Sequence, residues 1–246
     1  MKHLLFLAII SATLLVGCSD NSTDITANEI ADTSIQDMTL EELRMNISNQ
    51  EIQDLTPAEI QGMTFMREEE KLALDVYLIF YDQYEVNIFN NISGSEQMHT
   101  NAVLTLLDRY SIEDPVGSNA IGEFQNEDLQ TLYDELIAVG SASLEDALYV
   151  GCAIEEIDIL DLEEYMEGTD YKDLLLVYGH LLSGSFNHLR AYVPFWENQT
   201  GEVYVPRFMS QDQFDEIMSV GGSGGNGNGN GGNGGGGNGN GGGLGF

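Results

Sequence analysis

Two residues that lie three positions apart, Glu96 and His99, have the side chains and the spacing of a metal site. They share a face of a predicted helix with the apolar residues Val103, Leu106 and Tyr110, so both side chains should point into the protein core. A buried carboxylate and a buried imidazole need compensation, and in a four-helix bundle a Glu-x-x-His pair is the arrangement that binds paired iron or manganese ions. The alternative for this pair taken alone is a glutamate hydrogen-bonded to a structural histidine.

Three other predicted helices carry residues of the same types on their inward faces. Glu70 lies on the first, Glu155 and Asp158 lie three residues apart on the second, and His188 lies on the third. The apolar residues that define these faces are Met66, Ala73, Tyr77 and Phe80, then Ala147, Ile154 and Leu162, then Val177, Leu181 and Ala191. The predicted metal ligands are therefore Glu70, Glu96, His99, Glu155, Asp158 and His188.

Charge balance explains why carboxylates and imidazoles would occur together. Two divalent cations held close to each other need several carboxylates to neutralise and bridge them, and imidazoles complete the coordination. Without metal, the inward carboxylates would repel one another and raise one another's pKa values. The alternative is that Arg67, Lys71 or Arg190 neutralises them, although these residues lie off the inward faces.

Five helices are predicted to position these residues. Thr56, Pro57 and Glu59 mark the start of the first, which continues toward Tyr84 and could be interrupted near Gly62. The others run from Ser93 or Ser95 to Tyr110, from Asn126 to Val139, from Ser143 to Tyr165 and from Asp170 to Trp196. No stretch alternates with the period of two that strands require. We therefore expect an all-α domain, built as an antiparallel four-helix bundle with an extra helix between the second and third main helices.

The two ends of the chain differ in composition from its middle. An apolar run from Leu4 to Val16 and the segment Leu15 to Cys18 resemble a lipoprotein signal peptide, with Cys18 as the acylated residue. The expected organisation is residues 1–17 as signal peptide, 18–54 as a flexible tether with a short helix near 38–47, 55–218 as the bundle, and 219–246 as a disordered Gly/Asn-rich tail. Cys152, the only other cysteine, should be a small core residue.

The charge of the chain bears on its partners. The chain has 41 acidic and 8 basic residues and a formal net charge of −33, which excludes nucleic acid as a partner. Anionic lipid headgroups would also be repelled, so attachment to a membrane would depend on acyl chains at Cys18. The expected location is the cell envelope, lipid-anchored on the periplasmic or extracellular face. The oligomeric state stays open, with a dimer as one option.

Several segments resemble the rubrerythrins, a ferritin-like di-iron family. Glu70, Ala73 and Tyr77 match the pattern of that family's first helix, Glu96 and His99 match its second, and Glu155 with Asp158 matches a third-helix Glu-x-x-Glu. His188 corresponds to the histidine of the fourth helix, but Ser185 stands where that family has a glutamate. This departure places the second metal ion in question, and the chain also has no Cys-x-x-Cys pair for a rubredoxin-type iron centre.

The chain also resembles the ferritin-like bacterial family called domain of unknown function 2202. The similar segments are Met66 to Ala73, Ile154 to Ile159 and Gly184 to Ala191. This resemblance implies a ferritin-like antiparallel four-helix bundle, but it implies no activity.

Three functions follow from these residues. The first is a metal-dependent oxidoreductase that acts on peroxide, dioxygen or Fe(II). It would hold two iron or manganese ions, or a single ion. Tyr77 would form a hydrogen bond to a metal ligand or donate an electron. The second is metal sequestration or sensing without turnover. The third is a metal-free structural lipoprotein.

Overall fold

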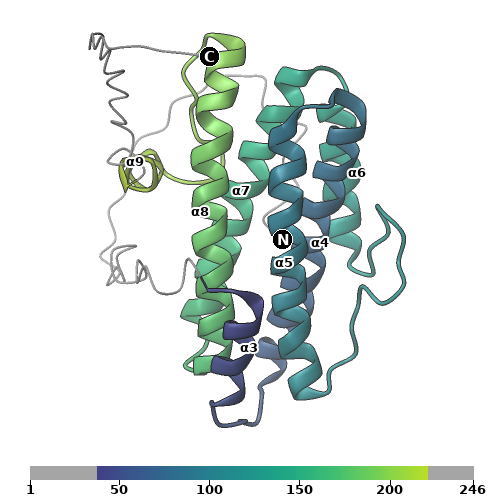
Figure 1. The fold of residues 1–246 in the computed structure, drawn as a ribbon, viewed down its shortest axis with the longest axis vertical. Coiled ribbons are helices and arrows are strands. Elements are labelled where there is room, and N and C mark those ends of the chain that lie inside the picture. Colours follow the sequence, from purple (N-terminus) through teal and green to yellow (C-terminus); the bar gives the residue numbers. More distant parts are fainter. Residues whose placement is uncertain (1–37, 221–246) are drawn as a thin grey trace, which may run out of the picture.

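The protein is described here by a computed structural model, in which residues 38–220 are placed. Within that range every regular element is a helix, as predicted, and no strand is present. Four long helices lie side by side (Figure 1). They are α4 (Pro57–Tyr84), α5 (Asn87–Tyr110), α7 (Leu144–Glu167) and α8 (Lys172–Thr200).

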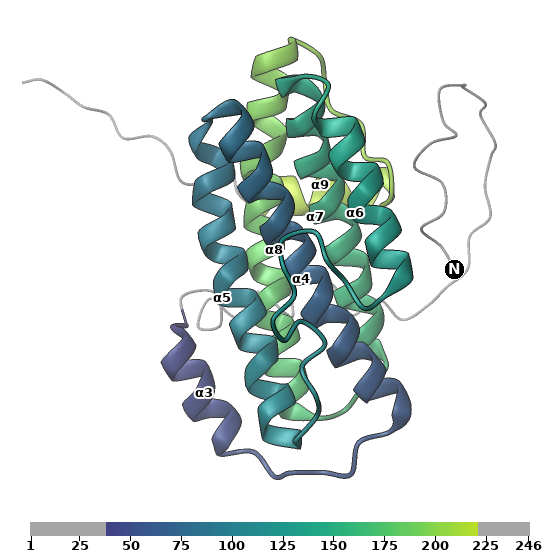
Figure 2. The ribbon, with the colours of Figure 1, turned by 90° about the vertical axis from the view of Figure 1, so that its right-hand side faces the viewer.

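The long helices form two hairpins that pack into one bundle. Helix α4 packs most extensively against α5, and α7 against α8, while contacts of α4 with α7 and of α5 with α8 join the two pairs. Only two residues separate α4 from α5 and four separate α7 from α8, so each pair must run in opposite directions. The predicted extra helix is α6 (Glu127–Gly140), which lies beside α7 (Figure 2).

Helix α4 is continuous, so the interruption considered near Gly62 does not occur. Its start has the predicted capping box, in which the Thr56 side chain accepts from the backbone N–H of Glu59 and the Glu59 side chain accepts from Thr56. Gly62 has a packing role instead, because a Cβ at this position would approach the ring of Tyr165 to 2.8 Å. The glycine therefore lets α4 and α7 come close together.

Helix α5 begins at Asn87, and the predicted start at Ser93 or Ser95 was wrong. Both serines are potential N-caps, but the helix starts without any side-chain cap. Phe89 and Ile92 are buried in the first two turns, and this packing stabilises the start of the helix in place of a cap. The predicted N-cap of α7, Ser143, is confirmed, and the helix ends at Glu167, two residues beyond the predicted Tyr165, with Gly168 as its C-cap.

Two short helices pack on the bundle in addition to the four long helices and α6. Helix α3 (Leu40–Ser48) buries Leu43 and Ile47 and packs on α5 and α8, so part of the predicted 18–54 tether is a packed helix. Helix α9 (Gln211–Val220) buries Phe214 and Ile217 next to α8. The predicted signal peptide, Cys18 and most of the Gly/Asn-rich tail lie outside the described residues.

None of the helices between residues 38 and 220 has an apolar stretch long enough to cross a membrane. The core contains apolar side chains from all seven helices, and a layer of buried carboxylates and histidines interrupts it between the four long helices. A buried polar layer of this kind is costly unless its groups are paired or bind a ligand.

Candidate metal centre

All six predicted ligands are buried, and they come from the four long helices. Five of them form two groups of ligand atoms, and within each group these atoms lie within 4.8 Å of one another. The first group is Glu70, Glu96 and His99, and the second is Glu96, Glu155 and His188. Glu96 belongs to both groups, so the two possible metal positions are joined through one carboxylate.

The first group is built by α4 and α5. Nδ1 of His99 lies 2.9 Å from Oε2 of Glu96 and 3.3 Å from Oε2 of Glu70. Glu96 and His99 are one helical turn apart, which gives their side chains the same direction. The two side chains also form a hydrogen bond, which is the alternative to metal binding for this pair taken alone. Glu70 adds a third ligand-type group, so the three side chains together could hold a metal ion.

The second group has the same composition and is built by α5, α7 and α8. Nδ1 of His188 lies 2.8 Å from Oε1 of Glu96 and 3.4 Å from Oε2 of Glu155. The two imidazole rings are stacked, with centroids 5.4 Å apart and an interplanar angle of 28°. Each oxygen of Glu96 therefore faces the Nδ1 atom of a different histidine.

Orphaned polar atoms test whether a metal fits this arrangement. Glu70 Oε1, Glu96 Oε1, Asp158 Oδ1 and His188 Nδ1 are buried and have no hydrogen-bond partner. Although Glu96 Oε1 and His188 Nδ1 are 2.8 Å apart, the two groups are not oriented for a hydrogen bond. Ligand atoms that point at the same place and have no hydrogen-bond partner are free to bind a cation. Carboxylate and imidazole ligands are suited to iron and manganese. The residues present could therefore hold a metal ion.

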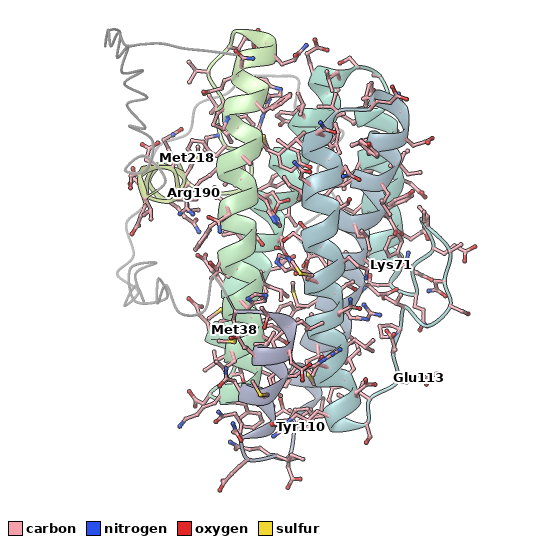
Figure 3. All side chains as sticks on the ribbon, in the orientation of Figure 1. Met38, Lys71, Tyr110, Glu113, Arg190 and Met218 are labelled. Atoms are coloured by element: carbon pink, nitrogen blue, oxygen red, sulfur yellow. The ribbon has the colours of Figure 1, made fainter. Side chains whose placement is uncertain are left out.

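The basic residues proposed as an alternative source of charge do not reach the centre. Arg67 donates to Asp114 and to the backbone oxygen of Thr100, and Lys71 pairs with Asp75. Arg190 donates to the backbone oxygen of Ile217 at 2.7 Å. Figure 3 shows Lys71 toward the loop on one side of the bundle and Arg190 beside α9 on the other.

Asp158, the sixth predicted ligand, lies next to the two groups but belongs to neither. Its carboxylate accepts a hydrogen bond from Ser185, and its other oxygen has no partner. Ser185 therefore contacts the polar layer from the helical position where the rubrerythrin resemblance expected a glutamate. Burial raises the pKa of Asp158, and the negative charges of Glu70, Glu155 and Glu96 raise it further.

Two residues around the centre have positioning roles. The hydroxyl group of Tyr77 donates a hydrogen bond to Oε1 of Glu155. This side chain therefore contacts a predicted ligand in addition to packing in the apolar core. Gly184 was not predicted to have a role at the site. A Cβ at Gly184 would lie 2.4 Å from both Cε1 and Nε2 of His99, so the missing side chain leaves room for that imidazole ring. The contact between Gly184 of α8 and His99 of α5 depends on how closely these two helices pack, so the sequence alone does not indicate it.

Burial and charge raise the pKa values of two of the predicted ligands, Glu70 and His188. Burial raises the pKa of Glu70 to about 7, against the opposing effect of His99. Burial lowers the pKa of His188, but the carboxylates of Glu96 and Glu155 outweigh it and raise the pKa to about 10. The metal-free centre therefore holds protons that a cation must displace.

We expect metal to stabilise the protein more strongly at higher pH. Since the folded-state pKa values of Glu70 and His188 lie above their usual ones, the metal-free folded protein binds more protons than the unfolded chain between about pH 5 and pH 10, and its stability falls as pH rises there. Each proton that a cation displaces adds about 1.4 kcal/mol per pH unit to the difference in unfolding free energy between the metal-bound and metal-free forms, or about 3–6 °C in Tm.

Thermal unfolding at pH 6, 7.5 and 9, with Mn²⁺ under anaerobic conditions and with a chelator, would measure this difference. Effects of surface charge are common to both forms and cancel. A Tm difference that stays constant or shrinks with pH would contradict the assignment of protonated ligands.

The fold and the site together define an all-helical protein with a candidate metal centre, and comparison with known proteins gives its family. Residues 59–221 match the family described as "Uncharacterized protein domain (DUF2202)", so the chain belongs to this family. The matched range contains all six predicted ligands. This match confirms the resemblance to domain of unknown function 2202 and does not test the one to the rubrerythrins.

The chain is also similar to a protein of known structure. It is 44% identical over 173 residues to the uncharacterized protein MJ0754 of Methanocaldococcus jannaschii, a match that covers 70% of this chain and 93% of the relative. The crystal structure of hypothetical protein MJ0754 matches with a TM-score of 0.67 over 69% of this chain and 96% of that one. The similarity extends over nearly the whole relative and about 70% of this chain.

Proposed function

We propose that this protein is a ferritin-like metal protein whose bundle holds two iron or manganese ions and acts as an oxidoreductase on peroxide, dioxygen or Fe(II). The observation that carries the proposal is the position of Glu96, whose two oxygens face the Nδ1 atoms of His99 and His188. A carboxylate between two equivalent Glu/His groups is suited to bridging two cations.

Each ion would have one terminal glutamate and one histidine. Glu70 and His99 would hold one ion, Glu155 and His188 would hold the other, and Glu96 would contact both. Two divalent cations carry four positive charges, and the three glutamates supply three negative charges. Asp158 is close enough to supply the fourth, which supports its place in the ligand set although it lies outside the two groups.

When bound, such a pair of ions supplies the redox chemistry. The residues of the chain hold the ligands in place and exclude bulk water, since all of the ligand side chains are buried. Tyr77 orients Glu155, and its ring lies 5.3 Å from that of Tyr192, measured between centroids. These two buried tyrosines are the redox-active side chains that stand next to the centre.

Sequestration of metal without turnover would use the same centre. The observation in its favour is Ser185, which offers a hydroxyl group where a further carboxylate ligand was expected and thus leaves the ligand set short. We also propose that the protein is attached to the cell envelope through acylated Cys18, on the strength of the Leu15 to Cys18 sequence. A metal-free structural lipoprotein is the third candidate.

Elemental analysis of protein purified without affinity metals tests the proposal. We expect about two iron or manganese ions per chain by the ligand count. Metal-loaded protein should oxidise Fe(II) or consume peroxide, and the chelator-treated protein should not. Bound metal without either activity would favour sequestration. No metal after purification and none after reconstitution would overturn both functions and leave the structural one.

A further inference from the structure

Aromatic side chains that can be oxidised form two groups, one next to the candidate metal centre and one nearer the surface. In the inner group, the ring of Tyr77 lies 5.3 Å from that of Tyr192, measured between centroids. Both side chains are fully buried. The hydroxyl group of Tyr77 donates a hydrogen bond to Glu155, a predicted ligand, so the inner group contacts the centre directly.

The outer group consists of Tyr149, Trp196 and Tyr204. The ring of Trp196 lies 5.5 Å from that of Tyr204 and 6.4 Å from that of Tyr149, measured between centroids. Trp196 and Tyr149 are partly exposed, whereas Tyr204 is buried and donates a hydrogen bond to Oε1 of Glu156. The outer group therefore extends to the solvent.

A single stretch of α8 connects the two groups to each other and to the centre. Tyr192 lies one turn after His188, a predicted ligand, and one turn before Trp196, so the three side chains share a face of the helix. The ring of Tyr192 occupies the space beside Gly151 of α7, where a Cβ would approach it to 2.6 Å. Aromatic rings therefore continue from the ligand Glu155 to the surface of the protein.

We propose that Tyr77, Tyr192 and Trp196 form an electron-transfer route between the candidate metal centre and a one-electron reductant in solution, such as ascorbate. Tyr77 would be oxidised at the inner end and Trp196 at the outer end, with the ring of Tyr192 between them. Electron transfer slows steeply with distance, and neighbouring rings at ordinary packing separations keep each step short. The proposal rests on the proposed function for the electron acceptor at its inner end.

Each electron step is balanced by a proton. When Tyr77 gives an electron to the oxidised centre, its phenolic proton moves along the hydrogen bond to Glu155, and both return when Tyr77 is reduced. Trp196 supplies that electron and regains one from the reductant, and its partly exposed indole exchanges its proton with solvent. The hydroxyl group of Tyr192 has no hydrogen-bond partner, so no acceptor for its proton is present and only its ring takes part.

The test uses the chelator-treated protein and drives the route in the reverse direction, so it does not depend on the metal. Trp196 is the only tryptophan of the chain, and azide radicals generated by pulse radiolysis oxidise indole in preference to phenol. The oxidised indole then takes an electron from a tyrosine of the same molecule. We expect the tryptophan radical to decay at a rate independent of protein concentration, while the absorption of a tyrosine radical appears at the same rate.

Tyr149 and Tyr204 also lie beside Trp196, so the route to the centre is measured with both of them replaced by phenylalanine. In this Tyr149→Phe/Tyr204→Phe protein a tyrosine radical should still form. Adding Tyr77→Phe should abolish it, whereas adding Tyr178→Phe should leave it unchanged. Tyr178 is the matched control, because it is a buried tyrosine outside the route whose hydroxyl group accepts or donates no hydrogen bond.

A second measurement uses single substitutions, so that a folding defect of the combined variants does not decide the outcome. Iron-loaded protein mixed with peroxide and rapidly frozen should give the electron paramagnetic resonance signal of a tyrosine radical. Tyr77→Phe should remove this signal. Trp196→Phe should retain it and slow its reduction by ascorbate.

A tyrosine radical that persists in the combined variant with Tyr77→Phe would overturn the proposal. A tryptophan radical that decays only by reaction between molecules in the Tyr149→Phe/Tyr204→Phe protein would overturn it too. The proposed function fails in a different way. In that case the protein binds no metal, and transfer between Trp196 and Tyr77 in the metal-free protein would still establish the route.

Discussion

Glu96→Ala should abolish binding of both metal ions, whereas Glu70→Ala and Glu155→Ala should each abolish binding of one. The reason is that the two oxygens of Glu96 face different histidines, while Glu70 and Glu155 each belong to a single group. Loss of the shared carboxylate removes a ligand from both positions. It also removes the negative charge that would offset the repulsion between the two cations. No other single residue of the centre has this double role.

Metal content after reconstitution, together with Tm with and without chelator, measures the effect. If metal is present at about a thousand times its Kd, it stabilises the folded state by about 4 kcal/mol, or roughly 10 °C in a domain of this size. Chelator should lower the Tm of the unchanged protein by about this amount and leave that of Glu96→Ala unaltered. Equal losses in the Glu96, Glu70 and Glu155 variants would contradict the bridging role.

Gly184→Ala should lower metal content from about two ions to about one, although it alters no ligand. A Cβ at this position would lie 2.4 Å from two ring atoms of His99, so the buried imidazole ring cannot keep its present position against α8. The ring must therefore turn away from Glu70 and Glu96.

Gly94→Ala is the matched control, because it replaces a glycine inside α5 where a Cβ would meet nothing within 4 Å. Alanine is favoured over glycine in a helix by about 1 kcal/mol, so this control should be unchanged or slightly more stable. Gly184→Ala should gain the same helical preference and still lose an ion. Full metal content in Gly184→Ala would show that His99 does not bind metal in the orientation seen here.

The sequence was sufficient for the helices whose ends are marked by local chemistry. Thr56 with Glu59 begins α4, Asn126 begins α6, and Ser143 with Gly168 bounds α7, and each of these signals acts through hydrogen bonds between neighbouring residues. Helix α5 shows the limit of this approach. Its start is stabilised by the burial of Phe89 and Ile92, and burial depends on residues distant in the sequence.

The same distinction applies to the acidic residues. Glu155 and Glu156 are adjacent and both are buried, yet Glu155 faces the metal centre while Glu156 accepts hydrogen bonds from Tyr204 and from backbone N–H groups of residues 207–209. Helical periodicity placed Glu155 on the face that points between the four long helices, because it determines the direction of a side chain around its own helix. Helical periodicity does not indicate which residues of the neighbouring helices face that side chain.

By itself, the sequence determined the helical class, the faces of the four long helices and the residue types that meet between them. Only the tertiary structure decided that Glu96 is shared by two groups, that Asp158 contacts Ser185, that Glu69 is left without a partner, and that Gly184 makes room for His99. The physical reason is that side-chain direction follows from local backbone geometry, whereas distances across a bundle depend on how closely each pair of helices packs.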